Sequence, residues 1–517
     1  MQIKKLAVAA GAVGAIALSL ITAAPASADY APNPSDVVGV GSDTVQYAID
    51  FLADGDYNSD TGANLGNRNK IVNFDATPDA NARLAYGAFG LNGTSAATSN
   101  CAPGTGGTAG SGNQNTTHTG DRPCVLNPTI VLREGQRPVL RPNGSGAGFN
   151  ALKADVAAAT HNIDFARASS ARAPGGTTYD SVTIGTDDLA MLVSSTTHAV
   201  PLTKDELASV YNCTVTDWST FGGTAGTIYP ILPQVGSGTR SSFLGNIGLT
   251  EATIGACVVN AEENDPEAID GAGVNSINAL EPMSSGRLNM YLGKDSGGTS
   301  IGAGYFNDPS CPYATVTAVV GFGACTVAGV TLTPNVQYFN STTPFVRNAT
   351  TTATGTSGAL TVTVASTVGI SAGMTATGTG ISTAPAAVVA SVNQATKVVT
   401  FGAGQTNTAA VSGSVSFTGS VTAYKATRNM YIYFRDADVN GSVAFQPGGT
   451  KNWVRTLFYN PCSGSTLNGT PIVNGVNCTS GGLYGPGGAP AVAGGTGQTL
   501  ISASGIVPSY AFQVGGA

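Results

Sequence analysis

The chain has 517 residues and is acidic, with 23 Lys and Arg against 30 Asp and Glu and a formal net charge of −7. A chain of this balance has no broad basic face, which excludes nucleic acid as a partner held by charge. Its length predicts two or three domains, because a domain usually takes about 100–200 residues.

Residues 1–28 have the parts of a secretory signal peptide. Two Lys precede an apolar run over 6–21, and Ala26-Ser27-Ala28 supplies an Ala-x-Ala cleavage site. Cleavage there removes two Lys and no acidic residue, so the charge of −7 becomes −9. The first Cys after the apolar run is Cys101, so we expect no lipid anchor. The sequence predicts a protein secreted to the extracellular space or the cell envelope, with its signal peptide cleaved.

Strand-like runs alternate with amphipathic helical patterns from Val37 to about Leu292. The run Val37–Val40 leads into a segment, 45–52, whose apolar residues share one helical face. Thr203 and Glu206 have the spacing of a capping box, which opens a further helix. This alternation of strand, loop and helix predicts an α/β architecture.

Residues 348–421 have a different composition. They contain one charged side chain, Lys397, and no Cys, and their apolar residues alternate with polar ones as strands require. This pattern predicts a small all-β module inserted into the α/β host. The module resembles the short β repeats of bacterial surface and tail-fibre proteins. Aromatic and Arg-bearing sequence resumes at 424–435, which suits a return to the host.

The Cys content agrees with export to an oxidising compartment. Eight Cys is an even number, and they fall in local couples along the chain. No C-x-x-C occurs and the three His lie apart from the Cys, so we expect no metal site and no cofactor. Among the possible connectivities we favour four disulfides between neighbours: Cys101 with Cys124, Cys213 with Cys257, Cys311 with Cys325, and Cys462 with Cys478.

Three segments have the same arrangement, in which a strand end is followed by small polar residues and then by a helix. They are 41–44, 143–146 and 236–240. Unpaired N–H groups and the positive end of the helix dipole make such a helix start an anion site. The alternative for any one of them is ordinary helix capping, since Ser, Thr and Asp cap helices in most proteins.

The order of these segments resembles that in the phosphate-binding proteins of ABC transporters, within the type II periplasmic-binding-protein superfamily. The resemblance covers about 36–346 and 422 to the end. Its matching stretches are 38–44, 144–146, 163–170, 202–207, 215–218, 233–240, 282–287 and 428–431. The resemblance implies two α/β lobes joined by two crossover strands, with the ligand clamped between the lobes.

On this resemblance the chain divides into a signal peptide, two lobes and the insert. The expected order is 1–28 signal peptide, 29–188 first part of lobe I, 189–310 lobe II, 311–347 return to lobe I, 348–421 inserted all-β module and 422–517 C-terminal part of lobe I.

The resemblance also implies which residues contact the anion. They form three loops: Ser42, Asp43 and Thr44; Gly144, Ser145 and Gly146; and Ser237, Gly238 and Thr239. Two positions depart from the family pattern. Ser169 stands where the family has an Asp that accepts the ligand's proton, and the family's Arg before the third loop is missing. Arg167 and Arg240 could supply the positive charge, and Asp43 could accept the proton; Arg167 is alternatively a surface or interlobe salt-bridge residue.

The implied function is capture of inorganic phosphate or a related oxyanion, with an ABC permease as partner and without catalysis. Because the family's carboxylate is replaced, sulfate or an organic phosphate remains an alternative ligand. Gly298–Gly302 matches the G-x-S-x-G pattern, but all three His precede Ser300, so a hydrolase triad cannot form in that order. The alternative function is a secreted surface or adhesion protein that uses the same scaffold and binds a partner through 348–421.

Overall fold

The computed structural model describes most of the two lobes and the whole insert. The expected signal peptide and Cys101, Cys124, Cys311, Cys462 and Cys478 lie outside the described residues. Within the described part of the chain, no helix is long and apolar enough to cross a membrane. The described residues are 31–55, 62, 64, 70–76, 129–172, 178–194, 197–264, 267–270, 273–291, 294–299, 325–327, 330–332, 336–339, 342–440, 466–467, 470–471 and 496–513.

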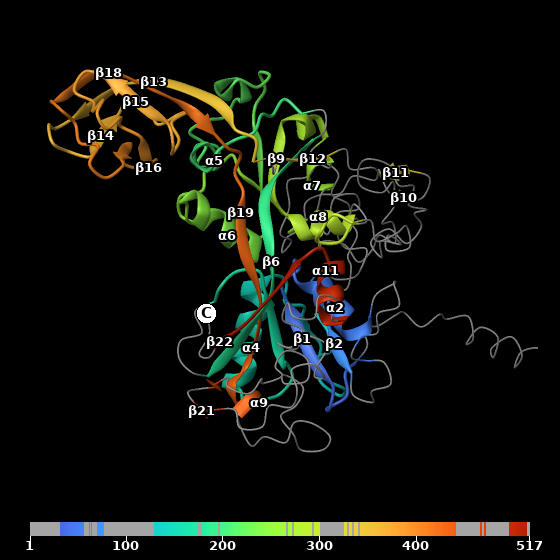
Figure 1. Cartoon of the computed structure of the whole chain (residues 1–517). Helices are drawn as coiled ribbons and strands as arrows, with labels where there is room; N and C mark the ends of the chain where they lie inside the picture. Colours follow the sequence, from blue (N-terminus) through green and yellow to red (C-terminus); the bar gives the residue numbers. More distant parts are fainter. Residues whose placement is uncertain are drawn as a thin grey trace, which may run out of the picture.

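Two α/β lobes lie one above the other, and two long strands run from one lobe to the other (Figure 1). These strands are β6 (Tyr179–Ser194) and β19 (Ala426–Arg435). Lobe I contains β1 (Val37–Gly41), α2 (Gln46–Asp54), β2 (Ile71–Asn73), β3 (Thr129–Ile130), β4 (Val139–Leu140), α4 (Ser145–Ala157), β5 (Phe165–Ala168), α9 (Asp436–Asn440), α11 (Thr496–Ala503) and β22 (Val507–Gln513).

Lobe II is built mainly from the middle of the chain. It contains α5 (Lys204–Tyr211), η2 (Trp218–Phe221), β7 (Tyr229–Pro233), α6 (Gly238–Ile247), β8 (Val259–Ala261), α7 (Glu267–Asp270), η3 (Gly273–Asn278), β9 (Ala279–Ser284) and β12 (Val336–Phe339). Further described elements are α8 (Ser285–Tyr291), β10 (Cys325–Val327), β11 (Val330–Leu332), β20 (Thr466–Leu467) and β21 (Thr470–Pro471).

One hydrogen-bonded path of strands passes through both lobes, in the order β2-β1-β5-β19-β6-β9-β7-β8. Each end of the path is parallel, as β1 pairs with β2 and β5, and β7 pairs with β8 and β9. The centre is antiparallel, where β19 pairs with β5 and β6, and β6 pairs with β9. The parallel ends place the carboxyl ends of β1 and β7 toward the junction between the lobes.

The long strand β6 belongs to the hydrophobic cores of both lobes. Its residues Val182 and Ile184 pack in the lobe I core, whereas Leu189, Met191 and Val193 pack with Trp218 in the lobe II core. Burying apolar side chains at both ends fixes the strand as a crossover. The predicted two-lobed α/β fold with crossover strands is therefore confirmed.

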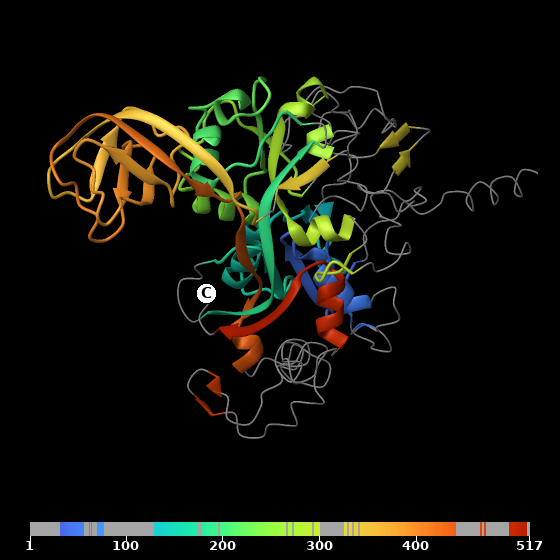
Figure 2. The same cartoon turned by 45° about the horizontal axis from the view of Figure 1, so that its top comes forward.

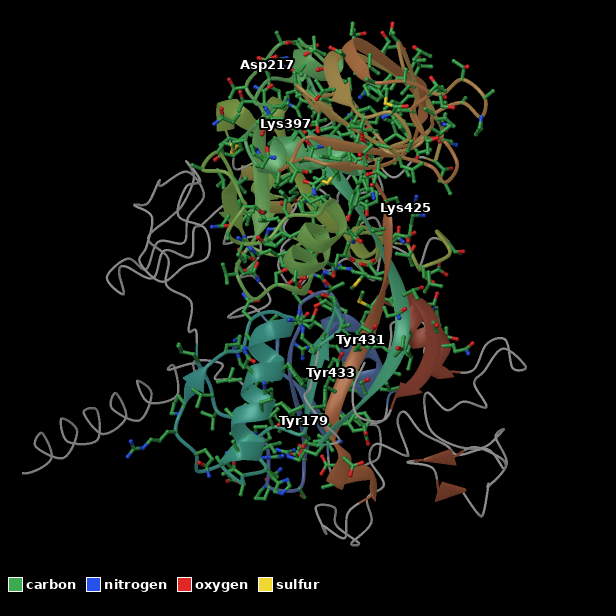
Figure 3. All side chains as sticks on the ribbon, turned by 90° about the vertical axis from the view of Figure 1, so that its left-hand side faces the viewer. Tyr179, Asp217, Lys397, Lys425, Tyr431 and Tyr433 are labelled. Carbon is green, nitrogen blue, oxygen red and sulfur yellow. A yellow bond between two sulfur atoms is a disulfide. The ribbon has the colours of Figure 1, made fainter. Side chains whose placement is uncertain are left out.

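The side chains on and beside β19 show how the two crossovers are joined (Figure 3). Tyr433 packs against Phe149 at a ring distance of 4.9 Å, and Phe149 also contacts Tyr179 at 5.5 Å. Toward lobe II, the Lys425 ammonium pairs with the Asp188 carboxylate at 2.7 Å. Aromatic packing thus holds β19 in lobe I, and an ion pair holds its start beside β6.

The strand β12 lies on the lobe II side, whereas the expected division places its residues in the return to lobe I. It pairs with Met191–Ser194 of β6, whose other edge there pairs with β9. The crossover β19 pairs with β6 only as far as Leu189. Beyond that point β6 would present an unpaired edge, and β12 covers it.

The inserted module is all-β, as the alternating pattern predicts, and it projects from the side of lobe II (Figure 2). Its strands pair in the order β15-β18-β13-β14-β17-β16 around an apolar core that includes Val399, Val415 and Phe417. The sheet starts at Phe345, three residues before the predicted boundary. The strands are β13 (Phe345–Gly355), β14 (Thr361–Val364), β15 (Thr375–Gly378), β16 (Val389–Asn393), β17 (Val398–Phe401) and β18 (Val411–Val421).

Polar contacts attach the insert to the first turn of α5. The predicted capping box is present, with Thr203 and Glu206 hydrogen-bonded reciprocally. The Glu206 carboxylate also accepts from Arg347 Nε of the insert at 2.8 Å, and Thr203 Oγ1 lies 2.7 Å from Ser371 Oγ. The neighbouring Asp205 carboxylate accepts from the backbone N–H of Ala372 at 3.0 Å. The insert is therefore docked on lobe II and not merely tethered to it.

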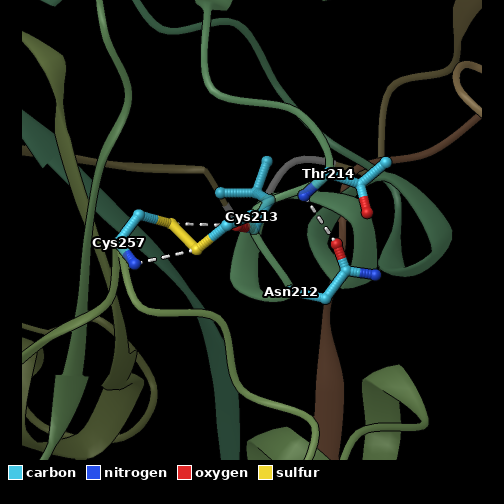
Figure 4. The surroundings of a disulfide bond; sticks show 5 residues. Asn212, Cys213, Thr214 and Cys257 are labelled. Carbon is cyan, nitrogen blue, oxygen red and sulfur yellow. Dashed lines mark hydrogen bonds between the residues drawn. A yellow bond between two sulfur atoms is a disulfide. The ribbon is translucent and has the colours of Figure 1, made fainter.

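A disulfide joins Cys213 to Cys257, as one of the four expected pairings requires (Figure 4). It connects the end of α5 to the segment that precedes β8. The Cys257 N–H donates to Cys213 Sγ at 2.9 Å, and Asn212 accepts from the Thr214 N–H at 2.8 Å. The disulfide helps to position β8 and the polar residues that follow it.

Candidate functional site

The three predicted loops meet at the junction between the lobes. The second and third loops touch directly, since the Gly146 N–H donates to the Gly236 carbonyl at 3.0 Å. Gly144 has a φ of 95°, and a Cβ at this position would lie 2.5 Å from the same carbonyl oxygen. Only Gly fits such a close backbone approach. The helices α4 and α6 therefore start against one another, one from each lobe.

Hydroxyl groups fill the space between these two helix starts. The Ser145 Oγ accepts from the Ser169 N–H at 2.9 Å and lies 3.2 Å from Ser169 Oγ. A Cβ added to Gly238 would lie 2.2 Å from each of these hydroxyls. Ser237 caps α6 by accepting from the Arg240 N–H at 3.0 Å. The structure thus brings Ser145, Ser169 and Gly238 together, with Ser237 immediately beside them.

The first loop joins the cluster through Thr44. Its Oγ1 lies 3.4 Å from Thr239 Oγ1 of α6. Both hydroxyls donate to one oxygen of Glu263, at 3.0 Å from Thr44 and 2.5 Å from Thr239, and the Thr239 N–H donates to the same oxygen at 3.2 Å. Glu263 follows β8 and is fully buried. The sequence analysis did not identify this carboxylate.

Ser42 and Asp43 are the other two polar residues of the first loop. Both are fully buried. Among the residues that the structure describes, none is a hydrogen-bond partner of the Ser42 hydroxyl, although the Ser42 backbone N–H and carbonyl bond to Arg167. The Asp43 Oδ2 accepts from Asn264 Nδ2 at 3.0 Å and lies 3.8 Å from Arg287 Nε. A buried hydroxyl without a partner costs free energy, and a bound ligand would recover it.

Arg167 uses its guanidinium inside lobe I. It donates to the carbonyls of Gly41 and Ser42 at 3.1 Å each and to that of Phe74 at 2.8 Å. Complete burial is the main cause that lowers the pKa of Arg167 to about 10. The residue braces the end of β1 and the loop that follows. Its contacts support neither a ligand contact nor the alternative of a surface or interlobe salt bridge.

Arg240 likewise points away from the other loops. Its Nε and Nη2 bond to the two oxygens of Glu251 at 2.8 and 2.7 Å. Its Nη1 donates to the Pro233 carbonyl at 2.7 Å and to Asn260. This bidentate pair anchors α6 within lobe II. The expectation that Arg167 and Arg240 supply the positive charge of the site is therefore not supported by their contacts.

Two other Arg stand at the junction instead. Arg428 of β19 pairs with the Asp187 carboxylate at 2.9 Å, and its Nη1 donates to Thr239 Oγ1 at 2.9 Å. Arg287 lies over the ring of Tyr47 at 4.2 Å, close to Asp43. Both Arg fall in stretches, 282–287 and 428–431, that carry the family resemblance. That signal could have identified them.

A short polar run after β8 was also missed. Glu262 accepts from Asn143 Nδ2 at 2.9 Å and from Gln234 Nε2 at 3.1 Å. Asn264 donates to the carboxylate of Asp43. Polar residues that follow a strand on the same side of a parallel sheet as the other loops were the available signal. Among the described residues, no group of three or more His, Cys, Asp or Glu could hold a metal ion.

The junction can bind an anion through neutral donors and a few paired Arg. Its donors are hydroxyls and the N–H groups of two helix starts, and its surroundings are nearly free of solvent. Carboxylates of Asp43, Asp187 and Glu263 lie among these donors and offset the charge of Arg287 and Arg428.

Comparison with known proteins gives one family. The family model of the PBP superfamily domain matches residues 132–454, which is more than half of the chain. No curated protein matches. Several solved structures match at low similarity, and their TM-scores are too low to support an argument about the ligand.

The solved structures include three phosphate-binding proteins. A phosphate ABC transporter substrate-binding protein from Clostridium perfringens is 21% identical, with a TM-score of 0.24, and the match covers 28% of this chain and 56% of that one. An ABC-type phosphate transport receptor from Vibrio cholerae is 26% identical, with a TM-score of 0.23 and coverage of 28% and 58%. A phosphate-binding protein from Stenotrophomonas maltophilia is 13% identical, with a TM-score of 0.22 and coverage of 38% and 68%. The chain thus spans little more than half of the first two.

Proposed function

The chain belongs to the PBP superfamily of solute-binding proteins, and we propose that its ligand is phosphate or a similar oxyanion, held between the two lobes. We further propose that the protein is secreted, delivers this ligand to an ABC permease and has no catalytic activity. The observation that carries the proposal is the meeting of the three predicted loops at one buried point. Each loop follows a strand end, and two of them open helices.

The chemistry of the meeting point suits an oxyanion. Hydroxyls of Ser145, Ser169 and Thr239 lie around the starts of α4 and α6, and Ser42 contributes a buried hydroxyl that has no partner within the described part of the chain. Each hydrogen bond to a charged group contributes about 1.5–3 kcal/mol net. Because several such bonds converge, micromolar or tighter binding needs no basic surface. Arg428 stands behind Thr239 and supplies positive charge.

Titration calorimetry of the mature protein with phosphate, and then with sulfate, tests the proposal. We expect phosphate to bind, and we expect Ser145→Ala to weaken binding about tenfold or more, because one hydrogen bond to a charged ligand is worth about 1.5–3 kcal/mol. The matched control is Thr350→Ala, which removes an exposed hydroxyl on the insert. Absence of heat with both anions, together with no rise in melting temperature, would contradict the oxyanion proposal and favour the adhesive role of the insert.

A further inference from the structure

Three consecutive residues of lobe II, Glu262, Glu263 and Asn264, each contact lobe I. They directly follow β8, and each has at most 1% of its surface exposed. Glu262 binds Asn143, Glu263 binds Thr44, and Asn264 binds both Asp43 and Thr44. We name this segment, Glu262–Asn264, the interlobe latch. It closes the lobes on one another with side chains of the protein itself.

The central carboxylate of the latch accepts hydrogen bonds from donors that are expected to hold an oxyanion. One oxygen of Glu263 accepts from the hydroxyls of Thr44 and Thr239 and from the Thr239 N–H in the first turn of α6. These are the donors that the sequence analysis assigned to an anionic ligand. A carboxylate oxygen and a phosphate oxygen accept hydrogen bonds in the same way at a helix start. Glu263 therefore satisfies donors that a solute would need.

The hydrogen-bond directions reinforce this assignment. Thr239 Oγ1 accepts from Arg428 Nη1 at 2.9 Å, and Thr44 Oγ1 accepts from Asn264 Nδ2 at 3.1 Å. Each hydroxyl has a single proton, which is therefore directed to the Glu263 carboxylate. The donors on both sides are set for an acceptor with negative charge, and the protein supplies one.

Asn264 holds the latch in an unusual backbone conformation. Its φ is 58°, in the left-handed region that few residues other than Gly adopt. Its Oδ1 accepts from the Ser284 N–H at 3.0 Å, while its Nδ2 donates to the Asp43 carboxylate at 3.0 Å. The side chain thus connects the end of β9 to the first loop of lobe I.

We propose that Glu263 is an internal ligand, which holds the interlobe site closed in the absence of solute and must leave it before an oxyanion binds. This inference rests on the proposed function, because it assigns Glu263 to the same site. A phosphate dianion and an ionised carboxylate repel each other and cannot share these donors. Solute capture is then a competition, and the apparent affinity equals the intrinsic affinity multiplied by the fraction of molecules in which the latch is displaced.

Calorimetry with inorganic phosphate on wild type, Glu263→Gln and Glu251→Gln tests the proposal. Gln keeps the size of the side chain and removes its charge, so Glu263→Gln should bind phosphate about tenfold or more tightly than wild type. Glu251→Gln is the matched control, since this carboxylate pairs with Arg240 inside lobe II and is not part of the latch. Its effect should be less than about threefold.

The opposite result would overturn the proposal. If Glu263→Gln binds phosphate more weakly than wild type, Glu263 accepts the proton of a bound phosphate and does not compete with it. Absence of phosphate binding in both proteins would contradict the proposed function itself. Small-angle X-ray scattering without any solute then tests independently whether Glu263 holds the lobes closed. Glu263→Ala should have a larger radius of gyration than wild type, whereas equal radii would show that Glu263 does not close the lobes.

Discussion

The interlobe junction and the β insert are both well packed, but they are stabilised by opposite means. Residues 348–421 of the insert contain one charged side chain, Lys397. The core of the insert consists of apolar side chains such as Val399, Val415 and Phe417. The junction is built from buried hydroxyls, carboxylates and Arg that belong to loops far apart in the sequence. A core of the first kind tolerates exchange of similar residues, whereas a polar network depends on every partner. Substitutions in the insert should therefore change stability without changing phosphate binding, whereas substitutions at the junction should change phosphate binding.

The largest effect should come from the core of the insert. Phe417 is 1% exposed. Phe417→Ala should destabilise the insert by about 3–5 kcal/mol, because it removes apolar contacts and leaves a cavity. Phosphate affinity, measured by calorimetry, should stay within about twofold, since no junction residue lies in this core. Loss of phosphate binding together with the insert would show that the two regions fold as one unit.

A polar substitution at the junction should lower phosphate affinity as well as stability. Asp187→Asn removes the carboxylate that pairs with Arg428 at 2.9 Å and leaves a buried cation without its partner. We expect a loss of about 3 kcal/mol in the free energy of unfolding, measured by urea denaturation. We also expect weaker phosphate binding, because Arg428 positions Thr239. Unchanged affinity would separate this ion pair from the site.

The contact between the insert and lobe II should contribute less to stability than the core of the insert or the ion pair at the junction. Arg347 donates to Glu206, whose side chain is fully buried, at 2.8 Å. Arg347→Ala should cost about 1–3 kcal/mol, because Glu206 keeps its charge and loses its cation. Hydrogen exchange should rise at the start of α5 and around Ser371. Uniform exchange across the molecule would indicate that the contact does not hold the insert to lobe II.

Lobe I contains a further polar interior, and it predicts a pH dependence. Burial, followed by the charge of Asp164, raises the pKa of Asp438 to about 7, and burial raises the pKa of Asp164 to about 6. Between about pH 4 and 7 the folded protein binds more protons at these groups than the unfolded chain. Their contribution to stability is therefore complete below pH 4 and is lost as the pH rises to 7. Asp438→Asn should reduce this slope in urea denaturation; an unchanged slope would contradict the assignment.

The smallest effect should come from the ion pair of Arg240. Its partner Glu251 has 58% of its side chain exposed. Glu251→Gln should change stability by about 0.2–1 kcal/mol, as exposed ion pairs do. It should leave phosphate binding unchanged in calorimetry, because Arg240 faces the interior of lobe II. A marked loss of affinity would restore Arg240 to the binding site.

The same contrast explains what could be predicted from the sequence. The alternating pattern of 348–421 and the capping box at Thr203 depend on neighbours along the chain, and both are present. The meeting of the loops followed from strand ends and a family resemblance. Side-chain directions at the junction could not be predicted in this way. Thr44 and Glu263 are 219 positions apart, and their contact depends on how the lobes close.

Arg167 and Arg240 also show that the sequence did not predict side-chain partners. Arg240 lies within the third predicted loop and Arg167 lies two positions before Ser169, and these places in the sequence suggested a role in binding the anion. A guanidinium has five donors and bonds to whichever carbonyls and carboxylates surround it. For Arg167 these are backbone carbonyls around the end of β1, and for Arg240 they are Glu251 and Pro233. Local sequence does not encode these partners.

A crystal structure of the mature protein grown with phosphate would test the central claim most directly. We predict a phosphate at the starts of α4 and α6, in contact with Ser145 and Thr239, with the Glu263 carboxylate moved away from both Thr hydroxyls. A structure from saturating phosphate with no anion at the junction, and with Glu263 still bonded to Thr44 and Thr239, would contradict the proposal that this junction binds oxyanions.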